Sequence, residues 1–280
     1  MKIFRHKCKS FEEIVYVIIF CMISSEIFAV NENILKCIEE ILPEKELSEF
    51  LRNGSKRIRS KIAILFLRAF DKALTEDICN IITACELIHN ASLLHDDVID
   101  NSELRRGVTT IGQKFSSNVS ILSGDYLVSK SIELLLKINN MKIFNIFNKC
   151  VQNMSLAEIK QYFLRDKNLS KEDYIEICKG KTAGLFSAVL ESCFIISGLD
   201  TEVALKFGTL FGIYYQLKND MESYSLSIDQ KNGIYTLVDI EGIENTQILL
   251  DNYKRELKEL LAKIPQNQYS LELEGIIYNL

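Results

Sequence analysis

Apolar residues recur along most of this chain at the three- and four-residue spacing that is typical of amphipathic helices. This pattern predicts helices over residues 31–50, 56–71, 75–100, 117–138, 142–164, 201–224 and 244–263. Ser170 and Asp173 resemble a capping box, so a further helix should begin there, run to about Ile196 and end at Gly198. Strand-like alternation is scarce. We therefore expect an all-α fold, with residues 30–280 forming a single-domain helical bundle around a central cavity.

The composition changes this picture little, but it narrows the classes of function. Of the 280 residues, 48% are apolar and 25% are charged, as in a soluble protein with a sizeable core. A net charge of −5 argues against general nucleic-acid binding. The eight cysteines form no CxxC pair, and most lie in apolar helical patterns. This favours reduced thiols in a cytoplasmic protein over zinc sites or disulfides.

Residues 1–29 form an N-terminal extension with two interpretations. A basic start, MKIFRHKCK, leads to the apolar run IVYVIIFCMI, and SSEIFAV contains small residues like those at a signal-peptide cleavage site. However, two glutamates separate these regions, and a run of about ten residues is too short to span a bilayer. The extension is therefore either a targeting or membrane-associating segment, or an apolar helix that packs on the domain or on a partner subunit.

The stretch HDDVIDNSELRRG, residues 95–107, places three carboxylates at the end of an apolar helix face. Asp96 and Asp100 are one turn apart and share a face, with Asp97 beside it. Like charges so placed repel, and a divalent cation would compensate them. Mg²⁺ prefers oxygen ligands and commonly takes one or two carboxylates together with water and phosphate. The alternative is a solvated helix end.

Basic residues follow this acidic cluster and also precede it in the chain. Guanidinium groups such as those of Arg105 and Arg106 suit phosphate oxygens, and Gly107 lets the backbone turn. The alternative there is a surface ion-pair cluster. Upstream, GSKRIRS (residues 54–60) crowds cations into the expected first turn of a helix. The helix dipole disfavours cations at that end, so this placement makes sense if an anion docks there. Carboxylates and arginines together indicate a metal–diphosphate site.

In combination these segments resemble the trans-polyprenyl diphosphate synthase family. GSKRIRS is similar to its GGKRxRP motif, and residues 96–107 keep the spacing of its first aspartate-rich motif, DDxxDxxxxRRG. SGDYL (123–127), AEIKQ (157–161) and KTAGLF (181–186) resemble further family blocks in the expected order. The resemblance covers roughly residues 31–238. It implies the isoprenoid-synthase type of helical fold, a dimer that is homomeric or heteromeric, and a cytoplasmic location, with membrane association left open.

The resemblance also implies an activity and a set of site residues. The family joins isopentenyl diphosphate to an allylic prenyl diphosphate with the help of Mg²⁺, and an apolar cavity protects the carbocation. The residues that would hold isopentenyl diphosphate are Lys56, Arg59, His89 and Arg106. Those that would bind the allylic diphosphate are Arg105, Lys181, Thr182 and Gln216, and the last three would also act in catalysis. Asp96 and Asp100 would ligate Mg²⁺, with Asp220 from a second motif.

The product length is also suggested by the sequence. In this family, bulky side chains just before the first aspartate-rich motif close the floor of the pocket. Here those positions hold Ala91 and Ser92, which are small. An open floor predicts a long-chain product, beyond five isoprene units. The alternative is that the small residues only allow close helix packing.

The second aspartate-rich motif departs from the family pattern. Aligned to QxxDDxxD, the stretch after Gln216 has Asn219, Asp220 and Ser223, so two of three carboxylates are missing. Ile234 stands where a diphosphate-binding lysine is expected. Each lost charge-assisted contact would cost about 1.5–3 kcal/mol.

Two functions follow from this mixture. The intact first motif, the arginine pair and Lys181 favour a Mg²⁺-dependent long-chain all-trans prenyltransferase. The degraded second motif favours a weakly active or non-catalytic regulatory subunit of a heteromeric synthase. A terpene cyclase is less well supported, because it has no need of GSKRIRS for a second diphosphate.

Overall fold

The computed structural model describes residues 23–41, 43–53, 55–167, 169–224 and 234–279. Most of the N-terminal extension, with Cys8, Cys21 and the apolar run up to Met22, lies outside these residues. Among the described residues, no helix combines the length and the apolar character that are needed to cross a bilayer.

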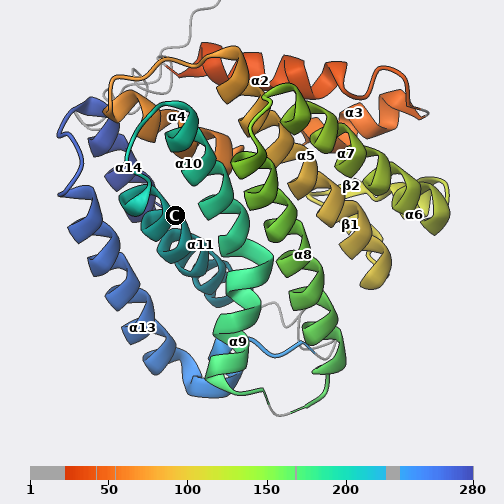
Figure 1. Cartoon of the computed structure of the whole chain (residues 1–280). Coiled ribbons are helices and arrows are strands. Elements are labelled where there is room, and N and C mark those ends of the chain that lie inside the picture. The colour runs from red at the N-terminus through yellow and green to blue at the C-terminus, as the bar shows by residue number, and fades with distance from the viewer. Residues whose placement is uncertain (1–22, 42, 54, 168, 225–233, 280) are drawn as a thin grey trace, which may run out of the picture.

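The described chain is all-α apart from one small hairpin, which confirms the expected fold class (Figure 1). The longer helices are α5 (Glu76–Ile99), α7 (Ser117–Lys137), α8 (Met141–Phe163), α11 (Glu202–Ser223) and α13 (Leu237–Leu261). The shorter helices are α2 (Ser24–Lys36), α3 (Glu44–Arg52), α4 (Ile58–Ala69), α6 (Ile111–Lys114), α9 (Lys171–Cys178), α10 (Gly184–Ile196) and α14 (Gln268–Asn279). The hairpin strands are β1 (Leu104–Arg105) and β2 (Val108–Thr109), which pair antiparallel.

The helices pack side by side, with α7 and α13 on opposite sides of the molecule and α10 and α11 between them (Figure 1). Helix α5 packs against α7, α2, α4 and α10. A cluster of buried aromatic rings joins α4, α10 and α11, and in it Phe66 and Phe207 have ring centroids 4.6 Å apart. Phe207 and Phe211 stack at 5.5 Å. This core fixes the spacing of the helices that carry the candidate site.

Small residues let α11 approach its neighbour at close range. A Cβ added to Gly212 would lie 2.3 Å from Cα of Ala183, and one added to Gly208 would lie 2.6 Å from Cα of Ser187. Only glycine fits at such distances without a shift of the backbone.

The helix predicted over residues 31–50 is wrong as a single element. Helix α2 ends at Lys36, and α3 begins at Glu44 with Pro43 as its N-cap. Proline has no N–H for the helical ladder and disfavours the helical conformation in the residue before it. Helix α2 also runs through the boundary that we expected between residues 29 and 30, and its Val30 and Ile34 are fully buried.

The helix that Ser170 was expected to open is interrupted. The N–H of Asp173 donates to the Ser170 hydroxyl at 3.1 Å, so the cap is present, and Gly198 ends the run with φ of 68°. Between α9 and α10, however, residues Lys179–Ala183 form a π-helical turn, η1. Turns of this kind are frequent at functional sites, and this one contains Lys181 and Thr182.

Towards the C-terminus, the sequence patterns predicted only part of the helical structure. Helix α13 begins at Leu237, before the predicted residue 244, but Gly242 interrupts it with φ of 80° and ψ of 165°. The helical pattern resumes after that kink, close to the predicted start. Helix α14 was not predicted at all. It packs on α4, where its Leu273 and Ile277 are buried.

Candidate active site

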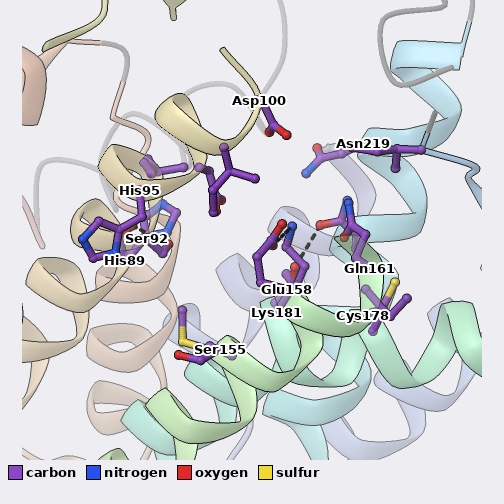
Figure 2. Close-up of a pocket in the computed structure, with 18 of the residues that line it drawn as sticks. His89, Ser92, His95, Asp100, Ser155, Glu158, Gln161, Cys178, Lys181 and Asn219 are labelled. Atoms are coloured by element: carbon purple, nitrogen blue, oxygen red, sulfur yellow. Dashed lines mark hydrogen bonds and ion pairs between the residues drawn. The ribbon is translucent and has the colours of Figure 1, made fainter. Parts of the chain in front are cut away.

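A cavity of about 710 Å³ lies among α5, α8, α9, η1 and α11 (Figure 2). The predicted site residues that line it are Arg59, His89, Ala91, Ser92, Asp96, Asp100, Arg105, Arg106, Lys181, Thr182, Gln216 and Asp220. Lys56 lines a smaller cavity of about 200 Å³ instead. Arg59, His89 and Arg106 line both cavities, so the two adjoin.

The three aspartates of the first motif have different environments. Asp97 is buried and accepts from Arg105, whose Nε lies 2.7 Å from Oδ1. Asp100 accepts from Nη2 of Arg165 at 2.6 Å. The pKa of Asp96 is raised to about 6, chiefly by burial, with a contribution from the nearby carboxylates of Glu158 and Asp100 and against the opposing effect of Lys181. Asp97 therefore braces the arginine, while Asp96 and Asp100 line the cavity.

The paired arginines sit on the hairpin that follows α5. Arg106 and Gly107 form its two-residue turn, with φ of 53° and 79°. Two consecutive positive φ values are typical of the type I′ turn, which strongly favours glycine at its second position. The pKa of Arg106 is lowered by burial and by the neighbouring charges of Arg105 and Arg57. An anion docking here would relieve that repulsion.

The GSKRIRS segment lies differently from our expectation. Helix α4 begins at Ile58, so Lys56 and Arg57 precede its first turn. Arg57 is the N-cap in a left-handed conformation (φ 47°), and its buried guanidinium donates to Glu86 at 3.1 Å and to the Leu51 carbonyl at 2.9 Å. Arg57 therefore holds the segment in place and leaves the neighbouring Lys56 and Arg59 to face the cavities.

Arg59 and His89 lie in the wall that the two cavities share. Arg59 is buried, its guanidinium carbon lies 4.7 Å from the centroid of the Phe186 ring, and its Nε has no hydrogen-bond partner. The pKa of His89 is held well below its ordinary value by burial and by the charges of Arg59 and Arg106. His89 is therefore neutral at physiological pH and has one N–H to donate.

On the opposite wall, η1 and α11 form a hydrogen-bonded network. The Thr182 hydroxyl donates to Oε1 of Gln216 at 2.9 Å, and Nε2 of Gln216 donates to Oδ1 of Asp220 at 2.7 Å. Tyr174 donates to the other oxygen of Asp220. The network fixes the amide orientation of Gln216, because its carbonyl must accept and its NH₂ must donate.

Lys181 pairs with Glu158 of α8, as Figure 2 shows. Burial would lower the pKa of Lys181, but Asp96 and Glu158 outweigh it, and the net effect raises the pKa. Glu158 belongs to the segment AEIKQ, which resembles a family block, but no role for that residue followed from the sequence. The sequence patterns also missed Tyr174 and Arg165, because pairings between distant segments leave no periodic signal.

Two of the residues that depart from the family pattern, Asn219 and Ile234, also line this cavity. Asn219 faces Asp100 across the opening (Figure 2), and Ile234 contributes an apolar side chain. The Ser223 hydroxyl donates to the carbonyl of Asp220 in its own helix, at 3.3 Å. Within the described residues, no three His, Cys, Asp or Glu side chains are grouped as a metal site. Asp96 and Asp100 still fit a Mg²⁺ ion, which needs only one or two carboxylates when water and phosphate complete its shell.

Ala91 and Ser92 line the cavity one to one and a half turns before Asp96. The Ser92 hydroxyl donates to the His89 carbonyl at 2.8 Å, so it is turned back onto its own helix. The lining also includes apolar side chains of α5, α7 and α8, among them Ile88, Val128 and Val151. The cavity therefore combines charged groups with an apolar surface.

Comparisons with known proteins agree with this arrangement. A family model described as polyprenyl synthetase matches residues 42–272. The chain is 32% identical over 203 residues to octaprenyl diphosphate synthase of Haemophilus influenzae, over 70% of this chain and 61% of that protein. It therefore spans less than two thirds of that relative's length. It is 31% identical over 241 residues to heptaprenyl diphosphate synthase component 2 of Bacillus subtilis, covering 81% and 67%.

A solved structure gives the same result for the fold. The polyprenyl synthase of Caulobacter crescentus, complexed with calcium and isoprenyl diphosphate, superposes with a TM-score of 0.85 at 25% identity, covering 92% of this chain and 94% of that one.

Proposed function

The chain belongs to the polyprenyl synthetase family, and from this premise we propose that it condenses isopentenyl diphosphate with an allylic diphosphate into a long-chain all-trans polyprenyl diphosphate. One observation carries the proposal. Two carboxylates at the C-terminal end of α5, the hairpin arginines and Lys181 line one cavity together with apolar side chains such as Ile88, Val128 and Val151. A diphosphate needs the charged groups, and a growing prenyl chain needs the apolar ones.

Isopentenyl diphosphate is assigned to the wall shared by the two cavities. Arg59, Arg106 and Lys56 supply positive charge there, and neutral His89 supplies a hydrogen bond without adding charge. The unpartnered Nε of Arg59 supports this role, because a buried guanidinium N–H without an acceptor is costly until an anion arrives.

The allylic diphosphate is assigned to the other side, near Arg105, Lys181, Thr182 and Gln216. Asp96 and Asp100 would hold Mg²⁺, which when bound neutralises the charge that builds on the leaving diphosphate. Asp220 is a third candidate ligand. Lys181 adds a fixed positive charge, and the network through Gln216 orients a carbonyl dipole beside the cavity. The apolar lining excludes water from the reacting carbon.

A regulatory subunit of a heteromeric synthase is the second candidate. Three residues favour this candidate because they carry no charge on the α11 side of the cavity. Asn219 is neutral, Ile234 is apolar, and the Ser223 hydroxyl donates to a carbonyl of its own helix. The component name of the Bacillus subtilis relative is consistent with it. We propose a dimer in the cytoplasm, homomeric for an enzyme and heteromeric for a subunit, with membrane association as a further possibility.

One assay separates the candidates. Purified protein, Mg²⁺, labelled isopentenyl diphosphate and an allylic primer of three isoprene units should yield products longer than five units. Asp96→Asn should abolish them, whereas Glu76→Gln, at the exposed far end of the same helix, should not. No product with any primer, together with activation of a catalytic partner by this chain, would establish the subunit instead.

A further inference from the structure

Arg165 is a pocket-lining cation to which sequence reasoning gave no role. It follows the C-terminus of α8, and its Nη2 lies 2.6 Å from Oδ1 of Asp100. Its guanidinium carbon lies 5.2 Å from the centroid of the Tyr162 ring. The side chain is 19% exposed, so it forms part of the cavity wall rather than of the outer surface.

This arginine has more donors than partners. Its guanidinium carries five N–H bonds in a planar fork, and Asp100 is the acceptor of one of its nitrogens. Its Nε is buried and has no hydrogen-bond partner. A buried N–H of this kind is costly unless an acceptor arrives, and an oxyanion beside Asp100 is the acceptor that best suits a planar fork.

Among the residues that the structure describes, those lining the opposite side of the opening carry no positive charge. The described lining residues from α11 are Tyr215, Gln216, Asn219 and Asp220, and those from residues 234–236 are Ile234, Tyr235 and Thr236. None of these carries a cation. A diphosphate held between Asp100 and α11 therefore depends on cations from other elements, and Arg165 lies at that end of the cavity.

We propose that Arg165 is a substrate-binding residue whose guanidinium bridges Asp100 and an oxygen of the diphosphate bound next to it. The inference rests on the proposed function, since it deepens the description of the same diphosphate site. In the absence of a metal ion, Asp100 binds the guanidinium of Arg165 and so competes with the diphosphate for its N–H donors. With a divalent ion on Asp100, the remaining donors of Arg165 hold the diphosphate in place.

Calorimetric titration of inorganic pyrophosphate in the presence of Mg²⁺ tests this contact without relying on turnover. Arg165→Gln should weaken binding tenfold to a hundredfold, as loss of a charge-assisted hydrogen bond does. Arg165→Lys keeps the charge but loses the fork, so an intermediate loss is expected. Lys167→Gln, two residues further on and exposed, is the charge-matched control and should bind like the unmodified protein.

A second titration, in EDTA, separates direct contact from an effect through Asp100. Asp100→Asn frees the fork and should tighten pyrophosphate binding, and adding Arg165→Gln should reverse this by tenfold or more. Equal affinities of the single and double variants would overturn the inference. Thermal unfolding of each variant checks the fold, and Arg165→Lys replaces Arg165→Gln if the latter unfolds.

The outcomes also distinguish the two proposals. If the unmodified protein does not bind pyrophosphate, both the proposed diphosphate site and the role of Arg165 are refuted. If it binds pyrophosphate and Arg165→Gln binds equally well, only the role of Arg165 is refuted.

Discussion

Burial of Asp96 makes the metal-free protein less stable at neutral pH, and Asp96→Asn should reverse this. The pKa of this carboxyl rises from an ordinary 3.8 to about 6, chiefly because burial disfavours its charged form. The folded state therefore binds a proton more readily than the unfolded state does. Stability should fall as pH rises from about 4 to about 6.

The size of the effect follows from the two pKa values. Moving a pKa from 3.8 to about 6 corresponds to about 3 kcal/mol, which is an upper bound because the neighbouring Lys181 is also perturbed by the substitution. We therefore expect Asp96→Asn to have little effect at pH 4 and to stabilise the protein by about 1–3 kcal/mol above pH 7.

Chemical denaturation in EDTA between pH 4 and pH 8 measures this difference. Asp125→Asn serves as a control, because that aspartate lies on α7 with its carboxylate 63% exposed. With Mg²⁺ and pyrophosphate present, the order should reverse, since only the unmodified protein gains ligand binding energy. A variant that is less stable than the unmodified protein at every pH would refute the reasoning, because the pairing with Lys181 would then outweigh burial.

Three further predictions concern the cavity and the helices around it. Ser92→Phe should shift the product distribution to shorter chains, by chromatography of the dephosphorylated products, while Ser92→Ala leaves it unchanged. Gly212→Ala should lower the free energy of unfolding by about 1–3 kcal/mol through overpacking against Ala183; Gly275→Ala, whose added Cβ meets only Glu272 at 3.9 Å, should be neutral or stabilising. Asn219→Asp combined with Ser223→Asp should raise turnover about tenfold to a hundredfold in steady-state assays, and no change would show that missing carboxylates are not the limitation.

Local patterns predicted the long helices well, because a buried helix face places apolar residues at three- and four-residue spacing within a short stretch of sequence. The helix expected over 75–100 is α5, Glu76–Ile99, and that over 142–164 is α8, Met141–Phe163. The break before Pro43, the π turn around Lys181 and helix α14 were not predicted. The last two depend on tertiary packing, which a single helical window does not contain.

For the site, motifs predicted which residues gather but not how they pair. Asp97 and Arg105 belong to one recognisable motif, yet their ion pair depends on the hairpin turn at Arg106. The pairs Asp100–Arg165 and Lys181–Glu158 join segments 65 and 23 residues apart in the chain. The packing of α8 against η1, and the contact of Arg165 with Asp100 at the C-cap of α5, bring these groups together.

The most direct test of the account is a crystal structure of the protein soaked with Mn²⁺ and pyrophosphate, with the metal located by its anomalous signal. The account predicts metal on Asp96 and Asp100, and pyrophosphate oxygens within hydrogen-bond distance of Lys181 and the hairpin arginines. Metal or pyrophosphate bound elsewhere, with this cavity empty, would contradict it.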